Sequence, residues 1–304
     1  MAAFRWKVIR TVFGLGERVA PGLSGRAAFV LFSLTPNPRK LTERERQAVR
    51  RADGFMQGAR HHRMKLGSGC VMAHEFRPDG PPRGAGTVLV VHGWRSRTEY
   101  MTALIEGYRR AGFRVISLDL PGHGQSQGRR LTLPIGIEAV ALAAQWFGPF
   151  EAVVGHSFGG LVLVNAVTGS LPGVAPVSTE RLVLISAPNA ISELLAGFGR
   201  MVHLGPRSFA ALAARVEKIS GRRLVDFDGA RLLSQVAVPT LVVHAPDDRE
   251  IRPADASAYA DAGAHVTLHW ADGLGHRRIL SDAAIVARAV DFLADRQSPM
   301  KSVA

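Results

Sequence analysis

One short stretch limits the possible folds of this chain more than any other. Residues 153–164, VVGHSFGGLVLV, hold a serine between glycines, after one apolar run and before another. The pattern G-x-S-x-G in this setting is typical of a strand that ends in a sharp turn and leads directly into a helix, with Ser157 at the apex. Side chains in place of Gly155 and Gly159 would collide with the neighbouring strand and helix. The stretch predicts a backbone-strained serine between a strand and a helix.

Short apolar runs alternate with helical patterns on both sides of this unit. We expect strands over residues 62–66, 71–76, 87–91, 115–120, 152–154, 182–185, 241–243 and 265–269. We expect helices over residues 98–111, 135–147, 158–167 and 282–293. Buried strands interleaved with helices predict an α/β fold with a mostly parallel sheet that helices cover on both faces.

The same pattern divides the chain into segments. Residues 1–60 form a basic N-terminal extension that we predict to be helical, and residues 61–187 form the first part of the core. Residues 188–235 are long, helical in pattern and rich in Leu, Phe and Met, so we interpret them as a helical cap inserted above the sheet. Residues 236–304 complete the core.

Composition and charge exclude several classes of protein. The single cysteine, Cys70, rules out an internal disulfide framework and predicts a reducing, cytoplasmic location. No stretch approaches the roughly twenty apolar residues of a membrane-spanning helix. The net charge is +13, and residues 1–60 supply +8 of it with twelve Lys or Arg and four acids. No zinc-ligand spacing or nucleic-acid recognition motif accompanies this charge, so we expect neither a metal nor a nucleic-acid partner.

The N-terminal extension carries an apolar stripe with basic residues between its members. Its residues recur near helical spacing: Phe4, Val8, Val12 and Leu15. We favour the interpretation that this stripe packs against the domain. The alternative is peripheral contact with a membrane surface through residues 1–40.

The end of a later strand and the loop after the last one carry the groups that a serine nucleophile needs. A serine hydroxyl requires a base that an acid holds in place, and active groups of a parallel sheet gather at the carboxyl ends of its strands. VPTLVVHAPDDREIRP presents Asp247 and Asp248, and LHWADGLGHRRIL presents His276. The chain order is therefore serine, acid, histidine.

In this order, and in three further motifs, the chain from about residue 61 onward resembles the α/β-hydrolase family. VVHGW at 90–94 is similar to the family's oxyanion loop, LDLPGHGQSQG at 118–128 to its loop after the fourth strand, and GHSFGG to its elbow. The resemblance implies an α/β-hydrolase fold, and loop-organising roles for His92 and His123. It also implies that backbone N–H groups of Trp94 and Phe158 hold the oxyanion.

The resemblance further implies acyl transfer to water, with Ser157 as nucleophile, His276 as base and Asp248 as the acid. Asp248 stands four residues after His244, as in the family's H-G-x-x-D stretch, but alanine replaces the glycine here. Asp247 therefore stays open as the acid. His156 adjoins the serine, and we expect it to have a structural role.

The expected substrate is a small-molecule carboxylic ester with a short or medium acyl chain, without a cofactor. Apolar residues of the cap either line an acyl pocket or hold the cap to the core: Leu194, Leu195, Phe198, Met201, Leu204 and Phe209. Alternatives are a membrane-associated lysophospholipase or monoacylglycerol lipase, amide, lactone or acyl-transfer chemistry with the same triad, and a non-catalytic binding protein.

Overall fold

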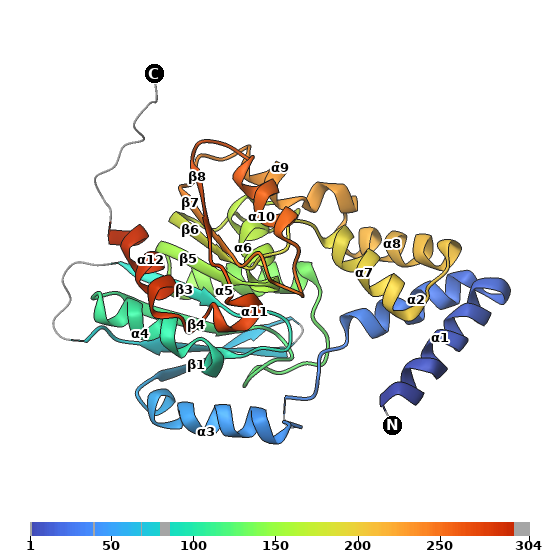
Figure 1. Cartoon of the computed structure of the whole chain (residues 1–304), viewed down its shortest axis with the longest axis horizontal. Helices are drawn as coiled ribbons and strands as arrows, with labels where there is room; N and C mark the ends of the chain where they lie inside the picture. The colour runs from blue at the N-terminus through green and yellow to red at the C-terminus, as the bar shows by residue number, and fades with distance from the viewer. Residues whose placement is uncertain (1, 39, 68, 80–85, 295–304) are drawn as a thin grey trace.

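A computed structural model describes residues 2–38, 40–67, 69–79 and 86–294 of the chain (Figure 1). The end of the last predicted segment, residues 295–304, lies outside these residues. The strands of the described chain are β1 (Arg60–Leu66), β2 (Gly69–Phe76), β3 (Thr87–Val91), β4 (Arg114–Asp119), β5 (Phe150–His156), β6 (Thr179–Ile185), β7 (Thr240–His244) and β8 (Val266–Trp270).

These strands form one sheet in the order β1-β2-β4-β3-β5-β6-β7-β8. β1 and β2 form an antiparallel hairpin, β2 pairs antiparallel with β4, and the remaining pairs are parallel. The predicted mostly parallel sheet is confirmed. From β3 the chain adds β4 on one side and then β5 on the other. In open α/β sheets, ligands bind in the crevice at the carboxyl ends of strands where the strand order reverses in this way.

Helices cover both faces of the sheet. The long helices are α1 (Ala2–Val19), α2 (Pro21–Ser33), α3 (Glu43–Gln57), α4 (Thr102–Arg110), α5 (Leu133–Phe147), α6 (Phe158–Val167), α7 (Ile191–Val202), α8 (Pro206–Ser220), α10 (Pro253–Ala260) and α12 (Ala283–Ala294). Shorter turns are η1 (Thr98–Tyr100), η2 (Leu224–Phe227), α9 (Gly229–Leu233) and α11 (Gly275–Arg278).

Alternate residues of each central strand point to opposite faces, so the sheet has two hydrophobic cores. In β3, Val88 and Val90 pack with α3, α4 and α12, whereas Leu89 and Val91 pack with α5 and α6. All four side chains are fully buried. This double burial explains why the parallel strands are continuously apolar in sequence.

The N-terminal helices join the predicted cap in one helical lobe, which we define as α1, α2, α7 and α8 (Figure 1). The Glu17 carboxylate accepts hydrogen bonds from the backbone N–H groups of Arg207 and Ser208, at 2.9 and 2.8 Å, and so caps the first turn of α8. At Gly25 a Cβ atom would lie 2.6 Å from the Ser208 carbonyl oxygen, so α2 and α8 are in close backbone contact. The helices of residues 2–33 therefore form one packed unit with the helices α7 and α8 of the predicted cap.

The favoured expectation for the N-terminal stripe was wrong. Phe4, Val8, Val12 and Leu15 are exposed, and a different face of α1 packs on the lobe through Phe13. The physical reason is that α1 has two apolar faces, and burying one of them turns the other to solvent. No described helix is both long enough and apolar enough to span a membrane.

Candidate active site

Ser157 occupies the turn between β5 and α6 in a strained backbone conformation. Its φ is 52° and its ψ is −128°, a combination that L-residues rarely adopt. The turn is possible because both flanking glycines lack side chains: a Cβ at Gly155 would lie 2.6 Å from the Gly160 backbone, and one at Gly159 would lie 2.5 Å from the carbonyl oxygens of Val91 and His92. Such strain at a loop apex directs the serine hydroxyl away from the sheet.

The structure brings His276 and Asp248 together from two separate loops. The His276 Nδ1 atom lies 2.8 Å from the Asp248 Oδ2 atom, and both residues are buried. Burial raises the pKa of Asp248, but the hydrogen bonds from His276 and from the Ile251 backbone N–H outweigh this and lower it to about 2. Asp248 is thus an ionised carboxylate that fixes the orientation of the imidazole.

Asp247, the alternative acid, is exposed, and among the described residues no hydrogen bond or ion pair joins it to the imidazole ring. Its Oδ1 atom accepts a hydrogen bond from the Gly275 backbone N–H at 3.1 Å, which holds the loop that carries His276. The geometry therefore favours Asp248 over Asp247 as the partner of the histidine.

Glu250 is a residue near the site that sequence reasoning missed. Its Oε2 atom lies 3.8 Å from the Nε2 atom of His276, and its Oε1 atom accepts a hydrogen bond from Arg277. Within the described chain, no hydrogen bond joins the Ser157 hydroxyl to His276, a contact that often tightens only in the substrate complex. The sequence feature that could have identified Glu250 is its position two residues after Asp248, in the same loop.

Two buried histidines hold the loop that follows β3. The His92 ring donates from Nδ1 to the Gly93 carbonyl oxygen and accepts at Nε2 from the Leu120 backbone N–H. The His123 Nε2 atom accepts from the Arg95 backbone N–H at 3.1 Å. Burial lowers the pKa of His92, and it lowers that of His123 to about 3, so both rings are neutral. Their hydrogen bonds hold the loop in place.

This ordered loop leaves Trp94 beside the serine elbow. The Trp94 ring packs edge to face against the Phe158 ring, with centroids 5.7 Å apart. Phe158 is the first residue of α6, where a backbone N–H has no partner within the helix. In the part of the chain that the structure describes, neither the Trp94 nor the Phe158 N–H donates to a protein acceptor. Both remain available to an oxygen near Ser157.

His156 supports His276 from behind the elbow. Its Nε2 atom lies 2.9 Å from the His276 carbonyl oxygen, and the two ring centroids are 4.7 Å apart. Burial lowers the pKa of His156 to about 3, so the neutral ring donates from Nε2. Its contacts are those of a residue that positions the histidine loop.

The variant His156→Phe is expected to lower kcat by roughly tenfold for any reaction that uses His276 as a base, because a misplaced base reduces the fraction of productive geometries. KM should change little, since His156 does not line the pocket. Steady-state kinetics on a p-nitrophenyl ester measures both constants. The variant His156→Gln keeps an N–H donor and should lose less activity, and equal losses in the two variants would argue against the positioning role.

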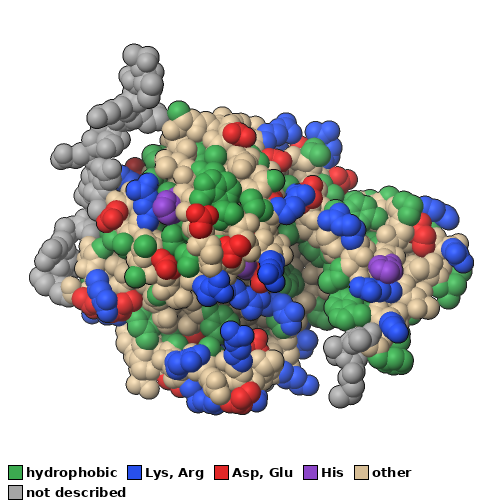
Figure 2. Space-filling view, viewed as in Figure 1, with side chains coloured by type: hydrophobic (Ala, Val, Ile, Leu, Met, Phe, Trp, Pro, Cys, Tyr) green, Lys and Arg blue, Asp and Glu red, His purple; other side chains and the backbone are tan. Residues whose placement is uncertain are grey.

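A pocket of about 680 Å³ opens beside Ser157, between the core and the helical lobe. Ser157, Trp94 and Phe158 line it from the core, and α7 lines it from the cap. The N-terminal extension supplies a third wall that sequence reasoning did not foresee: Trp6, Leu31, Phe32, Leu34, Thr35, Pro36 and Asn37. Figure 2 shows hydrophobic side chains in the hollow between the core and the lobe.

The cap residues predicted to form the pocket fall into two groups. Leu194, Phe198 and Met201 line it, on one face of α7. Leu195 is on the adjacent face of the same helix, which is buried in the core, and so does not reach the pocket. Leu204 and Phe209 pack near Gly199 inside the lobe instead. For these three residues the geometry favours the second alternative, in which their side chains pack within the cap and against the core.

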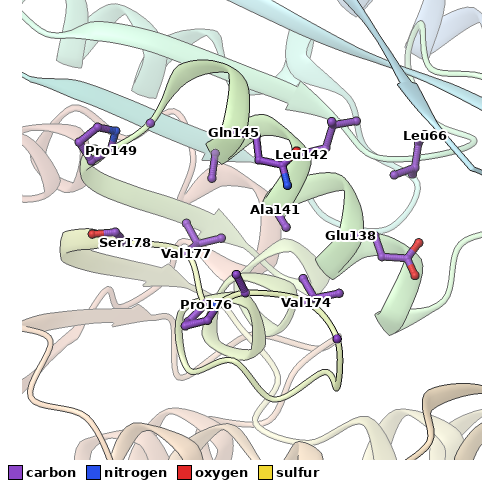
Figure 3. Close-up of a pocket in the computed structure, with 14 residues that line it drawn as sticks. Leu66, Glu138, Ala141, Leu142, Gln145, Pro149, Val174, Pro176, Val177 and Ser178 are labelled. Atoms are coloured by element: carbon purple, nitrogen blue, oxygen red, sulfur yellow. The ribbon is translucent and has the colours of Figure 1, made fainter.

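A second hollow, of about 570 Å³, shares no lining residue with the first. It lies between α5 and residues 173–178, and mostly apolar side chains form its surface (Figure 3). Glu138 is the one charged residue of its lining. No histidine is part of this lining, so the second hollow lacks a base for acyl transfer. The described residues also hold no cluster of three side chains suited to a metal ion.

The fold and this site together define the class of the protein. A sequence model of the alpha/beta hydrolase family matches residues 88–289, about two thirds of the chain, and the chain belongs to that family. It is 26% identical over 273 residues to the "Putative carbamate hydrolase RutD" of Variovorax paradoxus (strain S110), covering 75% of this chain and 98% of the relative.

Two further likenesses are consistent with this assignment. The chain is 29% identical over 171 residues to the "Putative protein-lysine deacylase ABHD14B" of Homo sapiens, covering 51% of this chain and 79% of the relative. The fold is similar to that of carboxylesterase CesB from Bacillus subtilis, with a TM-score of 0.58 at 17% identity, covering 82% of this chain and 96% of the other.

Proposed function

We propose that this chain is a serine hydrolase that cleaves carboxylic esters of short or medium acyl chain through an acyl-enzyme intermediate. One observation carries the proposal: the buried pair of His276 and Asp248, 2.8 Å apart, contacts His156, the neighbour in sequence of a strained Ser157 that lines an apolar pocket. A structural serine in a turn does not need this arrangement, whereas a nucleophilic serine does.

The chemistry follows from these groups. The Ser157 Oγ atom attacks the ester carbonyl carbon, and its proton passes to the Nε2 atom of His276. The N–H groups of Trp94 and Phe158 stabilise the negative oxygen of the tetrahedral intermediate. When the C–O bond breaks, His276 returns the proton to the leaving alcohol. Water then attacks the acyl-serine by the same proton route and releases the acid.

The pocket lining supports an acyl chain as the part of the substrate held beside the serine. Leu194, Phe198 and Met201 offer apolar contacts, and the volume of about 680 Å³ is in the range of small-molecule sites. The names of the relatives refer to a carbamate hydrolase and a protein-lysine deacylase. Carbamates and amides are therefore the substrates to compare with esters. A second candidate substrate, a single-chain lipid ester, is favoured by the exposed apolar row of α1.

A panel of p-nitrophenyl esters with acyl chains from acetyl to decanoyl tests the proposal and the size of the pocket. The variant Leu194→Trp is expected to shift the preference toward shorter chains. If two methylene groups of the acyl chain can no longer be buried, the binding free energy falls by about 1.6 kcal/mol. This corresponds to a loss of roughly 15-fold in kcat/KM for the longer esters.

The matched control for this panel is Val225→Trp, which adds the same side chain at an exposed position of η2 away from the pocket lining. It should leave the chain-length profile unchanged. A wild-type protein that hydrolyses none of the esters and does not react with a fluorophosphonate probe would contradict the proposed function.

A further inference from the structure

The outer face of α1 carries an uncovered row of large apolar side chains: Phe4, Val8, Val12, Leu15 and Val19, which are 46–75% exposed. With about 100° of rotation per residue, the row falls within an arc of roughly 80°. The opposite side of the same helix is the one that packs on the lobe, through Ile9 and Phe13. The row is thus a second apolar face of α1, and no described residue covers it.

We propose that the helical lobe docks on an anionic lipid bilayer through this face. Contiguous exposed apolar surface of this kind is uncommon on soluble proteins and marks an interaction site. At the junction of α1 and α2 the surface continues with Leu23, which is also exposed. A helix with such a row lies in the plane of the bilayer interface, with its apolar side chains below the lipid headgroups.

The charge of the lobe identifies the kind of surface. Lys7 and Arg18 are exposed along one flank of the row, and Figure 2 shows Lys and Arg beside hydrophobic side chains on the lobe. Glu17 is the single acid within α1 and α2, and the first turn of α8 engages both of its oxygens. A basic helix flank without free carboxylates complements phosphatidylglycerol or phosphatidylserine headgroups.

A groove between α2 and α8 extends this complementarity. It measures about 570 Å³, and four cationic residues line it together with Phe29 and Val30: Arg26, Arg130, Arg215 and Lys218. No acidic residue is part of this lining. The guanidinium group of Arg215 lies over the Phe29 ring, 5.9 Å from its centroid. The cationic lining of the groove suits the phosphate of a lipid headgroup.

The docked orientation connects the bilayer to the candidate active site. The inner sides of α1 and α2 contribute Trp6, Leu31 and Phe32 to the pocket that Ser157 lines. A lobe seated on a membrane brings one wall of that pocket close to the lipid. This step rests on the proposed function, and it assigns single-chain lipid esters, such as monoacylglycerols and lysophospholipids, as the substrate class.

Co-sedimentation with vesicles tests the docking without any catalytic step. The full chain carrying Ser157→Ala is mixed with vesicles of phosphatidylcholine alone or of phosphatidylcholine with phosphatidylglycerol. We expect binding to the anionic vesicles, and a loss of at least tenfold in the partition coefficient for the double variant Val12→Glu, Leu15→Glu. Lys7→Glu with Arg18→Glu should weaken binding to anionic vesicles and leave any binding to neutral ones unchanged.

The matched control is Val225→Glu, because Val225 is equally exposed but lies outside the lobe. It should bind like the parent protein. No binding by the parent, or equal binding by Val12→Glu, Leu15→Glu, would overturn the proposal. A concentration-dependent dimer in light scattering that the same double variant abolishes would also overturn it, in favour of self-association through α1.

Activity separates the two proposals. The double variant with native Ser157 should hydrolyse a soluble p-nitrophenyl ester at the parental rate and lose at least tenfold on monoacylglycerol presented in anionic vesicles. Vesicle binding without hydrolysis of any ester contradicts the proposed function alone. Hydrolysis of soluble esters without vesicle binding contradicts the docking alone.

Discussion

Replacing Ser157 by alanine is expected to reduce kcat for ester hydrolysis by roughly 10⁴- to 10⁶-fold, the scale on which loss of a catalytic serine acts in serine hydrolases. Of the described hydroxyl groups in the pocket lining, those of Ser157, Thr35 and Thr132, only that of Ser157 is on the strained turn before α6. Without the Oγ atom the acyl-enzyme cannot form. Single-turnover and steady-state assays with a p-nitrophenyl ester measure the loss.

The control for this variant is Ser234→Ala, which removes an exposed serine hydroxyl at the end of α9. It should keep parental activity and parental labelling by a fluorophosphonate. Circular dichroism should report the same fold for all three proteins, because alanine fits the space that the serine side chain fills. Undiminished hydrolysis by Ser157→Ala would show that the reaction uses another nucleophile or none.

The core of this fold could be predicted from sequence because its signals are local. The parallel strands are buried on both faces and so read as unbroken apolar runs, which is why β3 was predicted with its observed bounds. The helix after Ser157 was also predicted with its observed bounds, since Gly155 and Gly159 mark a turn that only glycine permits. The candidate acid and histidine could be searched for at strand ends, because the carboxyl ends of parallel strands share one edge of the sheet.

The surroundings of the site could not be predicted in the same way because they depend on tertiary docking. Phe4 and Phe13 are equally apolar, and only the packing of α1 on the lobe decides which of them is buried. Trp6 and Phe32 line the pocket although they precede Ser157 by more than a hundred residues. Leu194 and Leu195 are neighbours on α7, yet only the first reaches the pocket. Periodicity alone does not contain this information.

The variant Asp248→Asn is expected to lower kcat by about 10⁴-fold, because an amide in place of the carboxylate favours the wrong tautomer of His276, the proposed base. In the native site the His276 Nδ1 atom donates to Asp248, which leaves Nε2 as the acceptor in the proposed mechanism. The Asn side chain can present its N–H₂ group to Nδ1 and so move the ring proton to Nε2. Steady-state kinetics at neutral pH measures the loss.

The wild-type carboxylate should act over a wide range of pH. The pKa of Asp248 is lowered to about 2, below its ordinary value, so its stabilising interaction with the loop is complete above about pH 4 and is lost as the pH falls through about 2. An acid limb of the rate profile near neutrality would therefore belong to another group. Asp248→Asn should show a reduced rate at every pH in the assay range and not a shifted profile.

The neighbouring aspartate is the matched control for this last prediction. Asp247→Asn makes the same chemical change one residue away, at a side chain that accepts a hydrogen bond from the Gly275 N–H and does not touch the imidazole. An asparagine oxygen can accept the same bond, so we expect less than a fivefold change in kcat, in line with a neutral hydrogen bond worth about 1 kcal/mol. If the large loss followed Asp247→Asn and not Asp248→Asn, the acid would be the other carboxylate. The loop would then have to turn during catalysis.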